Sequence, residues 1–498
     1  MSLHKPIPLI LNYLLIISRV ISKVMENLLA RSIRYNSIGW LGLMILFCGC
    51  NSFKIDRERY LKAYQAGRLA QSEELLNLAI EHSLPENAYT SSKDSVMLLL
   101  DRATLHFVAG NIDEAIQDYQ IALEAMDYYN QNSPSEKILQ FILEDGVGAY
   151  PGEDFEQILA RVYFALALFQ REDYNNAFAL LRQAEEVQQK KKELYKNDPL
   201  TKDFRLVENP VAKYLMAALL ENQKDFSNAE ILYKQTEQLI GNTLQNLLLN
   251  KQENGEDLAT VILVAHNGNS PYKISSTTYG AAASPLALEM LLGAHGIPPA
   301  YSSMAGIPIP ILMQQIHSHR VPIWTRLSRK ERPLIPLYNV TAMAAHQLQQ
   351  KMPLIVAEGL ARLIMRRGVV AYFQEKDPQL GALADFGATI ANACTQADTR
   401  SWGTLPSSID LARFDVCPGD HTLHLHVNWG ITHPFIGEFP LKLKSGDLCV
   451  INIFNIHPGI LSVQIPEIYK NKNYEEPVYE ISTSSLSDTL PVYNDSVQ

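Results

Sequence analysis

The stretch Gly110-Asn-Ile-Asp-Glu-Ala115 decides how the first half of this chain folds, because its pattern returns further along. It returns as Glu172-Asp-Tyr-Asn-Asn-Ala177 and Lys224-Asp-Phe-Ser-Asn-Ala229, and in a weaker form as Gly67-Arg-Leu-Ala-Gln-Ser72. In the first three stretches the second residue is Asn or Asp, which accepts hydrogen bonds from the unpaired N–H groups that begin a helix. The pattern therefore predicts a recurring turn that leads from one helix into a second.

Small and large residues recur at fixed distances from these turns. A large residue follows the last residue of each stretch by four positions, and three of the four stretches have alanine twelve positions before it. This pattern resembles the tetratricopeptide repeat, in which small residues lie where two antiparallel helices cross. The resemblance implies a concave surface that binds a protein or peptide partner. The predicted packing residues are Ala103, Ala115, Tyr119, Ala122, Ala165, Ala177, Leu181, Ala184, Ala217, Ala229 and Tyr233.

The spacing of the turns departs from that of a regular array. From residue 72 to 115, 177 and 229 the steps are 43, 62 and 52 positions, whereas the standard repeat has about 34. Insertions must therefore separate the helix pairs. A general α-helical bundle with alanine-rich crossings is the alternative interpretation of the same pattern.

The pattern of apolar residues changes after the polar linker 250–256, where the second half of the chain begins. The apolar run Thr260–Ala265 predicts a buried strand, and apolar periodicity predicts helices over 284–292, 338–373 and 380–394. From residue 409 onward strands dominate, with predicted hairpins of 411–416 with 421–427 and of 435–443 with 448–454. We expect an antiparallel sheet or sandwich with the helices to one side.

These observations predict the fold class α+β. A tetratricopeptide-like α-helical repeat domain (50–250) is followed by a domain of helices and an antiparallel sheet (257–465). Residues 1–49 are interpreted as a signal or targeting segment, and residues 466–498, which are polar, as a flexible tail.

The segment before Cys50 predicts a membrane anchor. Arg31 and Arg34 precede about ten apolar residues and then Cys-Gly-Cys50, which is the order of a signal peptide, too short to span a bilayer. It resembles the lipobox of bacterial lipoproteins, in which the cysteine is lipidated, although Phe47 stands where that family usually has leucine. An uncleaved signal anchor is the alternative, and Met25 is a candidate for the true start.

Further motifs are Ala397-Asp-Thr-Arg-Ser-Trp-Gly-Thr-Leu-Pro406, Pro418-Gly-Asp-His421, Leu100-Asp-Arg102, Tyr150-Pro-Gly-Glu-Asp-Phe-Glu156 and Asn209-Pro-Val-Ala-Lys-Tyr214. Together they resemble an uncharacterised bacterial lipoprotein family with tetratricopeptide-like helices and a C-terminal α+β domain. Within the first motif, Asp398 and Arg400 would form an ion pair if the segment is extended, and Trp402 would cap the edge of the sheet. A structural clasp between helices and strands is favoured over a binding surface for a peptide or glycan. The resemblance implies a cell-envelope lipoprotein without an assigned reaction.

Composition narrows the classes of partner. The net charge is −10 with 19% charged residues, and no basic stripe is present, so nucleic acid is not an expected partner. Cys417 and Cys449 could form a disulfide or remain reduced.

The candidates for chemistry are few. His424 and His426 share one strand face and His421 the other, so this segment supplies at most two ligands, and no metal or cofactor is predicted. The polar loop His266–Pro271 follows a strand, where catalytic groups often collect. It contains no motif for a nucleophile or a phosphate.

The resulting hypothesis is a lipid-anchored scaffold of the cell envelope that faces the periplasm, with the outer membrane favoured over the inner membrane. It would hold a protein or peptide in its helical groove. The alternatives are an envelope hydrolase or glycan-active enzyme that uses the C-terminal domain, and a purely structural envelope component.

Overall fold

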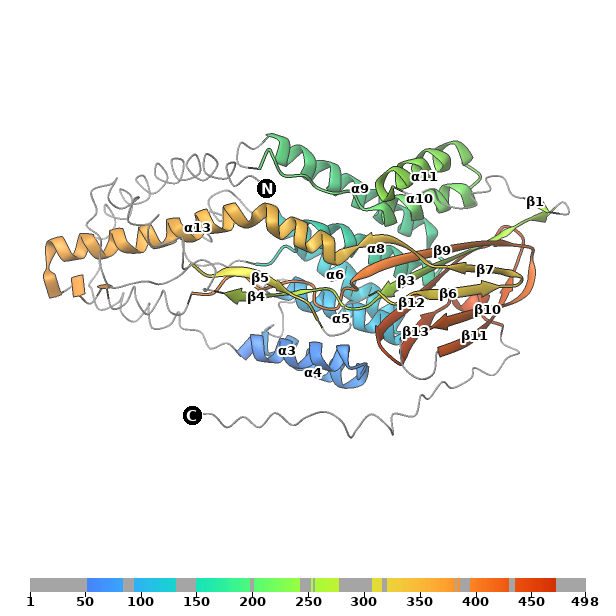
Figure 1. Ribbon diagram of the computed structural model, residues 1–498, viewed down its shortest axis with the longest axis horizontal. Coiled ribbons are helices and arrows are strands. Elements are labelled where there is room, and N and C mark those ends of the chain that lie inside the picture. The colour runs from blue at the N-terminus through green and yellow to red at the C-terminus, as the bar shows by residue number, and fades with distance from the viewer. Residues whose placement is uncertain are drawn as a thin grey trace.

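The computed structural model describes residues 52–83, 94–130, 149–197, 201–241, 252–253, 256–276, 307–315, 320–379, 381–382, 384–385, 395–429 and 435–471. The fold is mixed α+β, with helices mainly in the first half and strands in the second, as predicted (Figure 1). Cys50 and the predicted helix 284–292 lie outside the described residues, as does most of the predicted helix 380–394. No helix in the described part is both long and apolar enough to cross a membrane.

Helical hairpins follow one another along the first half. They are α3 (Ser52–Gln65) with α4 (Leu69–Ser83), α5 (Ser95–Ala109) with α6 (Ile112–Asn130), α8 (Asp154–Gln170) with α9 (Tyr174–Asn197), and α10 (Pro210–Asn222) with α11 (Phe226–Ile240). Each hairpin packs against the next. The predicted packing residues are all buried, and all eight alanines among them are 0% exposed.

The turns inside the hairpins explain the recurring sequence pattern. Its first residue has a left-handed backbone conformation at every occurrence, with φ of 71° at Gly67, 86° at Gly110, 58° at Glu172 and 65° at Lys224. Glycine adopts this conformation without strain, and the other two residues tolerate it at some cost. In two of the turns the next residue caps the second helix: the Asp173 carboxylate accepts from Asn176 N at 3.2 Å, and the Asp225 carboxylate accepts from Asn228 N at 3.3 Å.

The strands form two main sheets. The five-stranded sheet has the order β13 (Ile460–Gln464), β12 (Leu448–His457), β3 (Ala259–Asn267), β9 (Ser408–Val416) and β8 (Ile335–Asn339). The four-stranded sheet has the order β11 (Phe435–Leu443), β10 (Gly419–Val427), β6 (Ile323–Leu327) and β7 (Lys330–Pro333). The predicted strand 260–265 lies within β3.

Two features of the predicted sheet were wrong. The predicted hairpins do not form, because β9 and β12 belong to the five-stranded sheet whereas β10 and β11 belong to the four-stranded sheet. The two turns therefore connect one sheet to the other, as in a sandwich. In addition, β3 and β12 pair in parallel, with Thr260 opposite Leu448, so the sheet is not purely antiparallel.

The layers run from helices to the five-stranded sheet to the four-stranded sheet. Successive residues of β3 alternate between the two cores: Ile262 and Val264 pack with the helices, while Val261 and Leu263 pack with the second sheet. Both faces of β3 are thus covered, which explains its continuous apolar sequence. The apolar core of the helices continues into the sheet across the linker at 250–256.

Shorter elements complete the described chain. The strands β1 (Gln252–Glu253) and β2 (Glu256–Asp257) pair with each other, as do β4 (Tyr272–Ser276) and β5 (Ile309–Met313). The long helix α13 (Val340–Lys376), which matches the helix predicted at 338–373, contacts β5 and extends beyond the body of the protein (Figure 1). The final 3-10 helix, η1 (Glu467–Tyr469), buries Tyr469 to 3% exposure, so the tail is packed beyond the predicted boundary at 465.

Candidate functional site

The extended segment 397–407 joins the helices to the sheet. Its main chain is held by side chains of three helices. Arg57 on α3 donates to the carbonyl of Ser401 at 2.7 Å and of Thr399 at 3.1 Å. Asp101 on α5 accepts from the backbone N–H of Thr404 at 2.9 Å. Glu156 on α8 accepts from Trp402 N at 2.9 Å. We call this segment and its helix contacts the clasp.

Trp402 is the central side chain of the clasp. It is 1% exposed, and its ring centroid lies 5.2 Å from that of Tyr163 and 6.3 Å from that of Tyr119. Its indole N–H donates to the hydroxyls of Thr104 at 3.1 Å and Thr404 at 3.0 Å. The prediction that Trp402 caps the sheet edge was wrong, because it fills the space between the helices and the sheet.

Asp398 and Arg400 form the predicted ion pair. The distance from Arg400 Nη2 to Asp398 Oδ2 is 2.7 Å, and Asp94, before α5, lies 3.5 Å from Arg400 Nη1. The guanidinium also stacks over the ring of Tyr150 at 5.2 Å. These contacts tie the segment to the helices, which agrees with the favoured interpretation of a structural clasp.

Two carboxyl groups in the clasp are deeply buried. Burial raises the pKa of Asp101, which also accepts a hydrogen bond from Tyr60 Oη at 2.7 Å. Burial, and then the nearby Glu153 charge, raise the pKa of Glu156, which accepts from Tyr150 Oη at 2.6 Å. Glu156 accepts from the main-chain N–H of Trp402, and Asp101 accepts from that of Thr404. Both carboxyl groups therefore have a structural role, whatever their chemistry.

His266, in the loop predicted as a place for catalytic groups, lies at the centre of the core. Its Nδ1 lies 2.8 Å from Tyr163 Oη and its Nε2 lies 3.1 Å from Asn452 Oδ1. The ring stacks on Phe454 at 4.3 Å. Burial lowers the pKa of His266 to about 4, so the neutral form is the one that the core accommodates.

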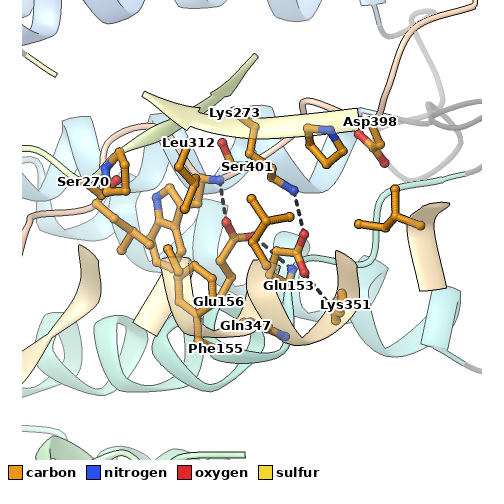
Figure 2. Close-up of a pocket in the computed structure, with 17 residues that line it drawn as sticks. Glu153, Phe155, Glu156, Ser270, Lys273, Leu312, Gln347, Lys351, Asp398 and Ser401 are labelled. Atoms are coloured by element: carbon orange, nitrogen blue, oxygen red, sulfur yellow. Dashed lines mark hydrogen bonds and ion pairs between the residues drawn. The ribbon is translucent and has the colours of Figure 1, made fainter. Parts of the chain in front are cut away.

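A cavity of about 110 Å³ opens beside the clasp, between the start of α8, the β4–β5 pair and α13 (Figure 2). Its walls combine apolar side chains with converging charged ones. The polar and aromatic lining residues include Glu153, Glu156, Lys273, Gln347, Lys351, Asp398 and Trp402.

Glu153 lies between two lysines at the cavity wall. Lys273 Nζ donates to its Oε1 at 2.6 Å and Lys351 Nζ to its Oε2 at 2.8 Å (Figure 2). Burial alone would raise the pKa of Glu153, but the two ammonium groups hold it well below its usual range. Asp154 next to it is paired with Lys191 at 2.7 Å and Lys351 at 3.5 Å.

The other predicted candidates are not brought to this cavity. His424 Nδ1 lies 3.3 Å from Glu438 on the four-stranded sheet, and His426 is exposed there. No group of three or more potential metal ligands is present among the described residues. Cys417 and Cys449 carry thiols and share no disulfide bond.

Sequence reasoning missed the lysines of the cavity. Glu153 and Glu156 lie in a motif that carried the family resemblance, but their spacing of three residues fits an ordinary helix start, at which Glu156 accepts from Glu153 N at 3.0 Å. Lys273 and Lys351 are isolated in the sequence, and only the tertiary fold brings them to Glu153.

In comparisons with known proteins, no family model and no curated protein matches this chain.

Trp402→Ala should lower the free energy of unfolding by about 3–5 kcal/mol, because it removes a fully buried aromatic side chain and leaves a cavity. Trp324→Ala is the matched control, since Trp324 on β6 is 46% exposed and its loss should cost less than about 1 kcal/mol. Urea unfolding of both variants measures the difference. Equal losses would contradict the central position of Trp402 in the core.

His266 should make stability depend on pH. Below about pH 6.5 the unfolded chain binds a proton at His266 that the folded chain does not bind until about pH 4, so stability falls as the pH falls through this window. The lost stability amounts to about 3 kcal/mol at pH 4. Urea unfolding of wild type and His266→Gln from pH 7 to 4 should show a shallower dependence in the variant.

The control for this measurement is His426→Gln, which changes an exposed histidine and should keep the wild-type dependence. If His266→Gln retains the wild-type pH dependence, another group is responsible.

Proposed function

We propose that this chain is a lipid-anchored scaffold protein of the bacterial cell envelope. Cys50 would carry the lipid, and the protein would face the periplasm, at the outer membrane in preference to the inner one. The order of positive charge, apolar run and Gly-Cys supports the anchor. Helix α3 begins at Ser52, two residues after Cys50, so the anchor would hold the folded body close to the membrane.

The stacked helical hairpins are the observation that carries the scaffold proposal. Small buried residues at the crossings and a capped turn within the hairpins support a tetratricopeptide-like array. Arrays of this kind usually hold proteins or peptides. One side of α3, α5 and α8 is already occupied, because side chains of these helices hydrogen bond to the main chain of residues 399–404. That side is therefore not open to a partner.

A partner would therefore bind the second helices of the hairpins, which are α4, α6, α9 and α11. We call their exposed side the outer helical surface. Exposed apolar side chains there support this: Leu194 on α9 is 59% exposed, and Ile231 and Leu239 on α11 are 53% and 38% exposed. We propose this outer helical surface, in place of an inner groove, as the site of the partner.

The alternative is an envelope hydrolase or glycan-active enzyme. The convergence of Glu153, Lys273 and Lys351 on a cavity favours it, because enzymes gather ionisable groups in clefts. One observation counts against an enzyme with Ser401, at the same cavity, as its nucleophile. The Ser401 hydroxyl accepts a hydrogen bond from Arg57 Nη2 at 3.0 Å, and a guanidinium cation cannot act as the base that would activate a serine. The scaffold therefore remains the leading proposal.

Cys50→Ser should move the protein from the membrane fraction to the soluble fraction, because two acyl chains supply enough buried apolar surface for a stable anchor and the variant would carry none. Metabolic labelling with a fatty acid, followed by cell fractionation, measures the loss of the lipid and the loss of membrane attachment. Cys48→Ser is the matched control and should retain the label. A Cys50→Ser protein that stays in the membrane would favour the uncleaved signal anchor.

A photo-crosslinking amino acid at Ile231 should trap a discrete partner in intact cells. The same amino acid at Ile436 on β11, which is 59% exposed, should not trap it, because it lies on the sheet side of the protein. Mass spectrometry of the adducts distinguishes the two sites. Identical adducts at both positions, or no adduct at Ile231, would count against the outer helical surface as the partner site.

A further inference from the structure

The cavity beside the clasp has the composition of a site for a small amphipathic molecule. Leu312, Leu348, Ile355 and Phe155 supply apolar wall, and charged and amide side chains share the same space (Figure 2). Ligand sites in proteins are mostly apolar with a few placed polar groups. A volume of about 110 Å³ compares with about 30 Å³ for one water, so the cavity suits a molecule of few non-hydrogen atoms.

The ammonium groups of the cavity wall suit an anion. Asp398 is paired with Arg400 at 2.7 Å. The ammonium groups of Lys273 and Lys351 meet at the Glu153 carboxylate, at 2.6 and 2.8 Å. A singly charged carboxylate adds less negative charge beside Glu153 than a doubly charged phosphate would, so it is the better match.

Both lysines have donor capacity beyond their contacts to Glu153. An ammonium group has three N–H donors. Within the described residues, Lys273 Nζ hydrogen bonds with Glu153, and Lys351 Nζ contacts Glu153 and, at 3.5 Å, Asp154. A ligand carboxylate could therefore bind the lysines without displacing Glu153.

Gln347 provides an independent indication of a ligand. Its side chain is nine-tenths buried in the cavity wall, and its amide nitrogen donates to Asp154. Its Oε1 has no hydrogen-bond donor within the described part of the chain. A buried acceptor without a donor is unfavourable, and Gln347 lines the cavity, so a ligand hydroxyl there could supply the missing donor.

We propose that this cavity binds a short aliphatic hydroxy acid. Its carboxylate accepts from Lys273 and Lys351, its hydroxyl donates to Gln347 Oε1, and its aliphatic carbons pack on Leu312 and Leu348. This site is independent of the outer helical surface and of the lipid anchor.

Ligand-observed NMR on the full chain, extracted from membranes in detergent, tests the proposal with 3-hydroxybutanoate as the probe. Butanoate lacks the hydroxyl and 1,3-butanediol lacks the charge, so we expect binding to weaken about threefold or more for the first and tenfold or more for the second. Equal binding of the diol would overturn the role of the lysines. Equal binding of butanoate would overturn the role of Gln347, and absence of 3-hydroxybutanoate binding would overturn the site.

Two pairs of variants locate the binding. Lys351→Gln should weaken binding at least tenfold, whereas Lys191→Gln, which changes the other lysine on Asp154, should leave it within twofold. Ala344→Leu fills the cavity and should abolish binding, whereas Ala345→Leu, on the exposed neighbour, should not. Thermal unfolding shows that each variant is folded. Binding that survives Ala344→Leu in a folded protein would place the ligand elsewhere and contradict the proposal.

Discussion

The need to satisfy the main chain of one buried, extended segment constrains the whole structure. Residues 399–404 lie in neither a helix nor a sheet, so their N–H and C=O groups have no regular partners and must find others. Arg57, Asp101 and Glu156 supply these partners from three separate helices. The first three hairpins can therefore take only the relative positions at which all three side chains reach one segment.

Buried polar contacts also join the helices to the five-stranded sheet at a second place. Arg413 on β9 donates to Glu221 on α10 at 2.7 Å and to Tyr233 Oη on α11 at 2.6 Å, and all three are buried. Removing one partner from such a cluster leaves an uncompensated buried charge, which costs more than the intact cluster contributes. The position of the last hairpin, α10 with α11, against the sheet is thus fixed by polar contacts, while apolar packing supplies the bulk of the stabilisation.

The sequence predicted local features well and spatial neighbours poorly. Backbone conformation and close helix crossings restrict which residue types fit, so such positions can be recognised in the sequence. Examples are the turn residues Gly110 and Asp225 and the buried Ala177. The strands around 411–427 were also found, but their pairing was not. A tight turn between two strands has the same residues whether it joins neighbours in one sheet or crosses between two sheets. The ion pair of Asp398 with Arg400 was predictable because it is local, whereas the cavity joins Glu153, Lys273 and Lys351, which nothing in the sequence links.

The parallel pairing of β3 with β12 has a consequence for the order in which the protein folds. Thr260 and Leu448 are 188 positions apart, so β12 can join β3 only when nearly the whole chain is available. Until then the helices have been synthesised while the apolar surface that they later present to the sheet stays open to water. Contacts between such distant segments make folding slow and leave intermediates prone to aggregation. The helices therefore depend on a strand that is synthesised late in the chain to complete the sheet against which they pack.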